Sequence, residues 1–273
     1  MSDTIITLRN VTKIYEGKTV LQNVNLSVPR GQSLALCGHN GSGKSTLLKL
    51  MAGLVKPTSG NVDVRKKALF HYIPEHFPKT DLTVWKYLQF MGRIDGIDKD
   101  KADQLSGQLL KDFFMEQMKD VPMKHLSKGT LQKVGVIQAL LKVPDIMLLD
   151  EPLSGQDRPS QMVFIEKMNR LRDQGTTLIM SCHEPYLMHR LSDVVYLVQD
   201  KGLSPGESSG EFEECRYILV FEDTPDCLLP AKLGERVRRQ GGRLIFSVTG
   251  QESSAVIGQM LQNGFTMREM YEQ

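Results

Sequence analysis

A glycine-rich stretch at residues 38–46 has the residue types and the spacing that can hold a phosphate chain. It reads Gly-His-Asn-Gly-Ser-Gly-Lys-Ser-Thr and lies between two apolar runs, 33–37 and 47–51. A phosphate chain needs several backbone N–H groups that approach it without Cβ atoms in the way, and the positive end of a helix dipole favours it further. Because the G-x-x-x-x-G-K-S spacing falls between an expected strand and an expected helix, we predict a nucleotide phosphate site here.

The residues of this loop divide the chemistry among them. The glycines allow close backbone approach, Lys44 can reach the β- and γ-phosphates as a point charge, and the Ser45 hydroxyl can ligate a Mg²⁺ that bridges them. The alternative, a loop that merely tolerates glycine, does not explain the full spacing. The candidate nucleotide-binding residues are Gly38, His39, Asn40, Gly41, Ser42, Gly43, Lys44, Ser45 and Thr46.

Two acids follow an apolar run farther along the chain. Residues 145–149 lead directly into Asp150, Glu151 and Pro152. Such a run is expected of a strand buried on both faces, whose carboxyl end opens into a site. Asp150 can hold Mg²⁺ through water, and Glu151 can orient and deprotonate an attacking water. Isolated acids could also be a solvated strand end, but downstream of a phosphate loop the catalytic interpretation is favoured.

The elements that must position these residues alternate between strand and helix patterns. Residues 4–11 and 24–28 have the alternation of a half-solvated antiparallel sheet, with a turn at 13–18 between them. Helical periodicity begins at Leu82 and marks a helical insertion at about 80–143. Further strands are predicted at 61–64, 68–73, 145–150, 176–181 and 193–198, and a further helix at 160–171.

The chain therefore divides into a large α/β domain and a small appendage. We predict the large domain at 1–203, a linker at 204–210 rich in Ser, Pro and Gly, and a small α+β domain at 211–273. Within the small domain, strands are expected at 217–221 and 243–248 and a helix at 253–261. This part carries no recognisable phosphate, metal or catalytic constellation.

Composition limits the classes of partner and compartment. The chain has 273 residues with 34 basic and 32 acidic side chains, so it lacks the electrostatic footprint of a nucleic-acid-binding protein. Its four cysteines are scattered without C-x-x-C spacing, which indicates a reduced, cytosolic protein without a cysteine-based zinc site. It lacks a signal peptide and any run of about 18 apolar residues, so any membrane span must come from another chain.

One further motif gives the resemblance to a family. Residues 126–130, Leu-Ser-Lys-Gly-Thr, precede an expected helix at 131–141 and are similar to the LSGGQ signature of ABC transporter ATP-binding subunits. The chain resembles this family over residues 4 to about 200. Ser127 can cap the helix, so that its hydroxyl, the Gly129 amide and the helix dipole point at an anion. In the family this anion is the γ-phosphate held by the other subunit, which implies a dimer with two ATP molecules between the subunits.

The resemblance assigns roles to three other residues. Residues 154–157 resemble the loop that crosses the dimer interface, which includes Asp157. His183 matches the switch histidine that contacts the γ-phosphate, although a lone histidine after a strand is more often structural. Tyr15 falls where the family stacks adenine; taken by itself, the same residue fits ordinary edge packing.

The sequence departs from the family at three positions. Glu75 stands where the family usually has a Gln that touches Mg²⁺; its carboxylate can still ligate the ion, but the donor capacity of an amide is lost. Lys128 and Thr130 replace the first Gly and the final Gln of the signature. The chain is similar to the bacterial exporter branch in three features: Ser-Lys-Gly at 127–129, Pro-Glu at 74–75 and the short α+β tail. This similarity implies export of a drug, peptide or other amphipathic compound through a separately encoded six-helix permease.

Altogether the resemblance implies a P-loop ABC ATPase, with an N-terminal antiparallel β subdomain, a RecA-like core, a helical subdomain and a small C-terminal α+β appendage. Its cofactors would be ATP and Mg²⁺, and its partners a permease and a second nucleotide-binding subunit, at the cytoplasmic face of the cell membrane. The implied catalytic residues are Lys44, Glu151 and His183, the metal ligands Ser45, Glu75 and Asp150, and the other nucleotide contacts Tyr15, Ser127, Gly129 and Asp157.

Three alternatives stay open at this point. An importer subunit with a regulatory tail would share all the ATP chemistry and differ in partner and direction. An ABC-type ATPase acting on DNA or ribosomes usually carries long coiled-coil insertions or tandem domains, which this chain lacks. A small-molecule kinase built on the same loop would not account for the signature at 126–130 or for His183.

Overall fold

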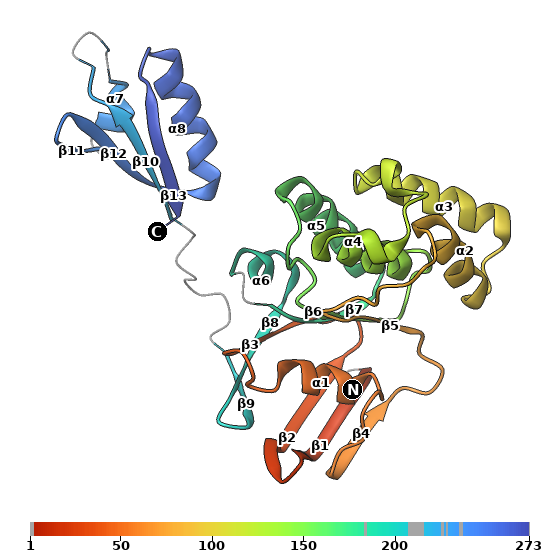
Figure 1. Cartoon of the computed structure of the whole chain (residues 1–273). Coiled ribbons are helices and arrows are strands. Elements are labelled where there is room, and N and C mark those ends of the chain that lie inside the picture. The colour runs from red at the N-terminus through yellow and green to blue at the C-terminus, as the bar shows by residue number, and fades with distance from the viewer. Residues whose placement is uncertain are drawn as a thin grey trace. The chain divides into compact units, whose positions relative to one another are not determined.

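The computed structural model describes residues 3–182, 185–206, 216–224, 227, 229–234 and 237–272. The chain divides into two compact units, Met1–Ser209 and Gly210–Gln273, which we describe separately (Figure 1). The first unit is an α/β fold and the second is an α+β fold, as predicted. Within the described residues, none of the helices has the length and apolar character needed to cross a membrane.

The first unit begins with a three-stranded antiparallel sheet in the order β2-β1-β4. Its strands are β1 (Thr4–Tyr15), β2 (Lys18–Pro29) and β4 (Ser59–Val64). The first two are longer than predicted, because Tyr15 pairs with Lys18 and the turn shrinks to Glu16 and Gly17. Both turn residues have positive φ, 47° and 79°, as tight hairpin turns require.

The central element is a six-stranded sheet that is parallel except at one edge. Its order is β5-β6-β7-β3-β8-β9, with β9 antiparallel to β8. The strands are β5 (Phe70–Ile73), β6 (Ile146–Asp150), β7 (Thr177–Ser181), β3 (Ser33–Cys37), β8 (Val194–Gln199) and β9 (Gly202–Pro205). Every residue of β6 and β7 is buried, as expected of strands covered on both faces.

The predicted linker at 204–210 is wrong at its start. Ser204 and Pro205 pair with Leu197 and Tyr196 as part of β9, so the sheet continues two residues into that stretch. The Ser-Pro-Gly composition suggested a loop, but proline is tolerated on an edge strand, where β9 lies. Residues 207–210 lie outside the described residues.

Helices cover both faces of the six-stranded sheet (Figure 1). Helix α1 (Lys44–Met51) lies between the two sheets and contacts β4, β6 and β7. The insertion contains the helices α2 (Val84–Ile94), α3 (Lys99–Asp112) and α4 (Lys128–Leu140). It also has single 3₁₀ turns at Glu116–Met118 and Met123–His125. Two more helices follow the insertion, α5 (Arg158–Asp173) and α6 (Pro185–Leu191). The helix α4 contacts β5, so the insertion reaches the sheet directly.

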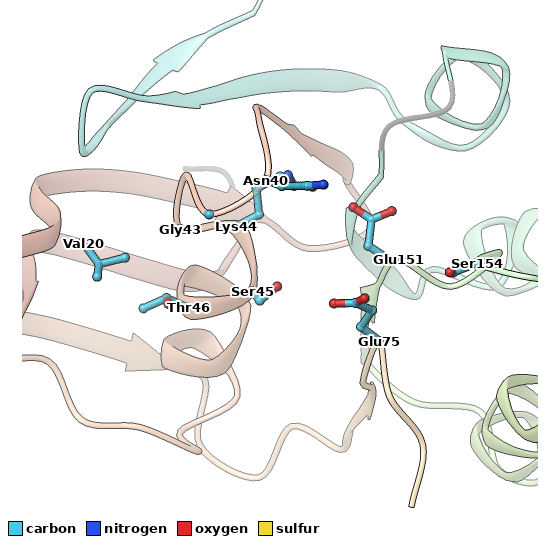
Figure 2. Close-up of a pocket in the computed structure, with 10 residues that line it drawn as sticks. Val20, Asn40, Gly43, Lys44, Ser45, Thr46, Glu75, Glu151 and Ser154 are labelled. Carbon is cyan, nitrogen blue, oxygen red and sulfur yellow. The ribbon is translucent and has the colours of Figure 1, made fainter. Parts of the chain in front are cut away.

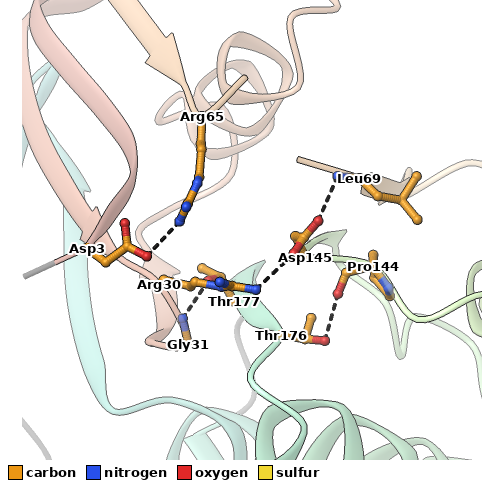
Figure 3. Close-up of polar contacts among 9 residues, drawn as sticks. All are labelled: Asp3, Arg30, Gly31, Arg65, Leu69, Pro144, Asp145, Thr176 and Thr177. Atoms are coloured by element: carbon orange, nitrogen blue, oxygen red, sulfur yellow. Dashed lines mark hydrogen bonds and ion pairs between the residues drawn. The ribbon is translucent and has the colours of Figure 1, made fainter. Parts of the chain in front are cut away.

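Polar contacts tie together the amino ends of the central strands (Figure 3). Asp145, just before β6, accepts hydrogen bonds from the Leu69 amide at 3.0 Å and from the Arg30 guanidinium at 3.3 Å. The Gly31 amide donates to Thr177 Oγ1 at 2.8 Å, which joins the start of β3 to the start of β7. Because these strands are parallel, the carboxyl ends of β3, β6 and β7 lie together at the opposite end of the sheet from these contacts.

The second unit is a four-stranded antiparallel sheet in the order β11-β12-β10-β13, with a helix packed on it. Its elements are β10 (Arg216–Glu222), α7 (Ala231–Gly234), β11 (Val237–Gln240), β12 (Arg243–Thr249), α8 (Gly250–Gln262) and β13 (Met267–Glu272). It has its own core, which includes Leu219, Phe221, Phe246 and Met260.

Candidate functional site

A cavity of about 530 Å³ opens where β3 and β6 end. Figure 2 shows the glycine-rich loop and α1 on one side of it and two glutamates on the other, with the Glu75 carboxylate turned toward Ser45. The lining residues are Val20, Asn40, Gly41, Gly43, Lys44, Ser45, Thr46, Glu75, Glu151 and Ser154. The fold thus brings the predicted phosphate loop, one predicted metal ligand and the predicted general base to one space.

The loop is built for close backbone approach. Gly38 has φ of 144°, and an added Cβ would lie 2.3 Å from the Val198 carbonyl oxygen, so that only glycine fits. Helix α1 begins at Lys44, and its N-cap residue Gly43 offers no side chain to its amides. Among the described residues, none gives the buried Ser42 Oγ a hydrogen-bond partner. Open amides at a helix N-terminus beside an unsatisfied hydroxyl suit a phosphate group.

Lys44 lies folded over the loop rather than extended into solvent. Its Nζ donates hydrogen bonds to the carbonyl oxygens of Gly38 at 2.7 Å and His39 at 3.3 Å, and the residue is only 6% exposed. The ammonium group is therefore held beside the cavity that it lines. A cation fixed there attracts a polyphosphate strongly, since the partly buried setting weakens solvent screening.

Asp150 is the centre of a buried hydroxyl network. Its Oδ1 accepts from Ser45 Oγ at 2.9 Å and from Ser181 Oγ at 2.7 Å, and its Oδ2 accepts from the Tyr72 hydroxyl at 3.1 Å. The carboxylate is thereby fixed in orientation next to Ser45. An oxygen-only pair of this kind fits Mg²⁺, which prefers hard oxygen ligands and keeps several waters.

Tyr72 stays a hydrogen-bond donor in this network. Burial raises the pKa of its phenol well above the ordinary value, and the negative charge of Asp150 raises it further. Neither Tyr72 nor Ser181 was a predicted site residue. Ser181 is also the β7 residue paired with Asp150 in the sheet, so its role follows from strand register rather than from any motif.

Glu151 lies at a sharp turn immediately after β6. It has φ of 48°, a left-handed conformation that is uncommon for residues other than glycine. Its amide donates to both the carbonyl oxygen and Oγ of Ser181, at 3.1 and 3.2 Å. Strain of about 1–3 kcal/mol at such a position is typical of functional sites. Here the turn places the Glu151 carboxylate in the cavity opposite the loop.

The predicted signature and the loop at 154–157 pack against each other. Ser127 caps α4 by accepting from the Thr130 amide at 3.2 Å. An added Cβ on Gly129 would lie 1.8 Å from the Gly155 carbonyl oxygen, so that the two backbones are in direct contact. Asp157 caps α5 through the Ser160 amide at 3.0 Å. The cavity lining does not include Ser127, Gly129 or Asp157.

Asp157 is also paired with a lysine of α4. The Lys133 Nζ lies 2.5 Å from its carboxylate. That hydrogen bond, together with the Ser160 amide, holds the pKa of Asp157 well below its ordinary value of 3.8. The residue is therefore ionised at neutral pH and links α4 to α5.

The comparisons with known proteins agree on one family. A family model described as ABC transporter matches residues 21–154. The zinc import ATP-binding protein ZnuC of Pseudomonas fluorescens is 35% identical over 196 residues, which cover 71% of this chain and 74% of that protein. ZnuC of Pseudomonas putida is 35% identical over 229 residues, with 84% and 88% covered. The chain belongs to the ABC transporter family.

Solved structures of the family share the fold. An ATP-binding subunit of an ABC transporter is 27% identical, with a TM-score of 0.68 over 74% of this chain and 89% of that one. A dimeric ATP-binding cassette bound to ADP and Pi has a TM-score of 0.69 over 76% of this chain and all of that one; at 22% identity it shows the fold alone. As an ABC family member, the chain is an ATPase that uses ATP with Mg²⁺.

The roles that the family resemblance gives to His183 and Tyr15 stay predictions. His183 lies outside the described residues, so its predicted γ-phosphate contact stays a prediction. Tyr15 lies at the hairpin tip, 40% exposed, with Lys13 Nζ at 4.6 Å from its ring centroid. The exposed ring is available for stacking on adenine, and that role stays a prediction as well.

The names of the relatives correct the expected direction of transport. Lys128 in the signature, Glu75 after Pro74 and the short α+β tail were interpreted as features of an exporter branch. Two Pseudomonas relatives, which match 71% and 84% of the chain, are named zinc import proteins, and this favours the importer alternative.

Proposed function

We propose that this chain binds and hydrolyses ATP to drive an ABC importer, together with a separately encoded membrane permease. The observation that carries the proposal is the convergence of Lys44, Ser45 and Glu151 on one cavity, with Asp150 fixed beside Ser45 at 2.9 Å. The importer direction is supported by zinc import proteins that are 35% identical to this chain over 196 and 229 aligned residues.

The residues on the loop side would bind and neutralise the triphosphate. Lys44 and the amides at the start of α1 would hold the β- and γ-phosphates. Ser45 and Asp150, with Glu75 as a further candidate, would hold Mg²⁺, which when bound would neutralise charge that develops on the phosphates during transfer. Because the transferred γ-phosphoryl group is metaphosphate-like in the transition state, this positioning would supply most of the catalysis.

Glu151 would orient the attacking water from the side of the cavity opposite the loop. Its carboxylate faces the loop across the space that the γ-phosphate would occupy (Figure 2). It can accept the proton of the water as the oxygen of that water bonds to the γ-phosphorus and the bond from the γ-phosphorus to the bridging oxygen breaks, with ADP as the leaving group. His183 is proposed to contact the γ-phosphate.

A second copy or a close relative would complete the site. Ser127 and Gly129 lie at the N-terminus of α4 but outside the cavity of their own chain, as a contact made across a dimer requires. Their hydroxyl, amide and helix dipole would close on the γ-phosphate held by the partner subunit. Hydrolysis would release this contact, and the separation would pass through the segment after Glu75 to the permease at the cytoplasmic face of the membrane.

Reconstituted transport tests both the function and its direction. The chain is co-purified with its membrane permease and placed in liposomes with ATP on the side that carries the chain. Zn²⁺ is the first cargo to follow, with a fluorescent zinc probe. An importer moves cargo toward the side of the ATPase, and Lys44→Ala should abolish this movement. ATP-driven movement away from that side would contradict import.

A further inference from the structure

Two residues that depart from the usual family motifs, Glu75 and Lys128, lie close together in this chain. Glu75 follows β5, and Lys128 is the first residue of α4, more than fifty positions later. The Lys128 Nζ lies 3.6 Å from Glu75 Oε1, with the two side chains 49% and 40% exposed. Neither charge is present in the usual motifs, which have Gln and Gly at these positions.

Glu75 adds a negative charge where a polyanion must bind. It lines the same cavity as Glu151 and Ser45, and Ser45 donates a hydrogen bond to the carboxylate of Asp150. A carboxylate in place of an amide repels ATP through space, and near a protein surface this repulsion is several times stronger than in bulk water. The His76 Nδ1 also lies 3.5 Å from Glu75 Oε1.

Lys128 likewise occupies a position that is unfavourable for its own charge. It lies in the first turn of α4, where the positive end of the helix dipole disfavours a cation, and this turn contains no acid of its own. An anion from outside the helix can offset that cost. Glu75 is placed to supply it.

The neighbouring contacts hold the two charges in place. Gln132 is 1% exposed and donates from Nε2 to the Pro74 carbonyl oxygen at 2.9 Å. An added Cβ on Gly135 would lie 2.6 Å from the Phe77 ring, so that this glycine packs directly on the aromatic side chain. Residues 128, 132 and 135 share one face of α4 by helical spacing. The segment from Pro74 to Phe77 therefore runs along the helix, which keeps the backbone of Glu75 beside the first turn of α4.

We propose that Lys128 is a positioning residue for the nucleotide site of its own chain. Its ammonium group holds and neutralises the Glu75 carboxylate, so that the cavity admits ATP despite the added acid. The ion pair of Glu75 and Lys128 thus takes the place of the neutral Gln side chain that the family usually has. This inference rests on ATP binding at the proposed site and is independent of the direction of transport.

ATP affinity measured without divalent cations tests the proposal most directly, because no metal then screens Glu75. Isothermal titration in EDTA compares the wild-type chain with Lys128→Ala, Glu75→Gln and the double variant. Lys128→Ala should weaken ATP binding roughly threefold to tenfold, the range for loss of one partly exposed charge interaction. Glu75→Gln should bind at least as tightly as wild type, and the double variant should match Glu75→Gln within about twofold.

The control is a lysine of similar exposure in another ion pair. Lys124 lies 2.6 Å from Asp81, is 51% exposed, and does not line the cavity. Lys124→Ala should leave ATP affinity unchanged. Raising the salt concentration should shrink the defect of Lys128→Ala, since salt screens partly exposed charges. Lys128→Gln serves as a second variant if the alanine variant melts at a lower temperature than wild type.

Two results would overturn the inference. Wild-type affinity in Lys128→Ala would show that the charge of Lys128 does not act on the site. An equal loss in the presence and absence of the Glu75 carboxylate would show that Lys128 contacts nucleotide by itself. Failure of the wild-type chain to bind ATP at all would instead contradict the proposed function.

Discussion

At the scale of single residues, the environment of Asp150 determines how the metal is held. Its two oxygens are shared among the hydroxyls of Ser45, Tyr72 and Ser181. Of these only Ser45 belongs to the phosphate loop. Tyr72 and Ser181 orient the carboxylate from neighbouring strands, and such supporting groups commonly affect metal affinity as much as some direct ligands do.

Removal of the Tyr72 hydroxyl should therefore weaken the metal site. In Tyr72→Phe the Mg²⁺ concentration for half-maximal ATPase activity should rise about tenfold, the low end of such effects. ATP binding in EDTA should stay as in wild type, because Tyr72 does not line the cavity. The matched control is Tyr87→Phe, whose hydroxyl donates to Gln138 at 2.6 Å in the helical insertion. An unchanged Mg²⁺ requirement in Tyr72→Phe would show that Asp150 needs no such support.

The same residues show what the sequence could and could not reveal. Lys44, Ser45, Asp150 and Glu151 were predicted because their motifs are local and each fixes its own strand-to-turn geometry. Ser181 reaches Asp150 only because β6 and β7 pair in one register. That register depends on the whole sheet, so no short motif could have predicted it.

At the scale of elements, α4 contacts both the segment at Glu75 and the loop at 154–157. One of its faces carries the segment at Glu75, and Gly129 and Lys133 contact the loop at 154–157. Any movement of this helix must move both segments. The signature glycine is required here for packing within the chain, in addition to the contact proposed across the dimer.

The packing role of Gly129 is testable by a single methyl group. In Gly129→Ala the added Cβ meets the Gly155 carbonyl at 1.8 Å, so a backbone must shift and the free energy of unfolding should fall by about 1–3 kcal/mol. Gly107→Ala in α3 is the control, since an added Cβ there meets nothing within 4 Å and should stabilise the helix by up to about 1 kcal/mol. Equal melting temperatures for the two variants would contradict the close approach.

The ion pair between Lys133 and Asp157 should give stability a defined pH dependence. Because the folded state holds the pKa of Asp157 below 3.8, its contribution is complete above about pH 4 and declines as pH falls toward the folded-state pKa. Asp157→Asn keeps a side chain that caps α5 but loses the charge. The difference in melting temperature between wild type and Asp157→Asn should be largest near pH 7 and shrink below pH 4. A constant difference would contradict the ion pair.

The buried strands near the site were predicted well, but two edge strands of the second unit were not. The apolar runs at β6 and β7 predict buried strands from the local sequence alone. By contrast β11 and β13 are edge strands with mostly exposed side chains, and Val237–Gln240 contains three polar residues in a row. They become strands through pairing with neighbours that a local pattern does not contain.

At the scale of the whole molecule, the proposed function assigns two parts of an ATP site to separate places in one chain. The cavity with Glu151 lies where β3 and β6 end, and the capped N-terminus of α4 lies outside it. The second unit has a core of its own around Phe221 and Phe246. We therefore expect ATP to join two subunits through their first units.

The variant Glu151→Gln tests this expectation most directly. Glutamine fits the same turn but cannot accept the proton of the attacking water, so turnover should fall by about 10²–10⁴-fold while ATP still binds. Light scattering should then show a particle of twice the 30.8 kDa chain mass when ATP is added, and a monomer without it. Wild-type ATPase activity in this variant, or a monomer that holds ATP without pairing, would contradict the account.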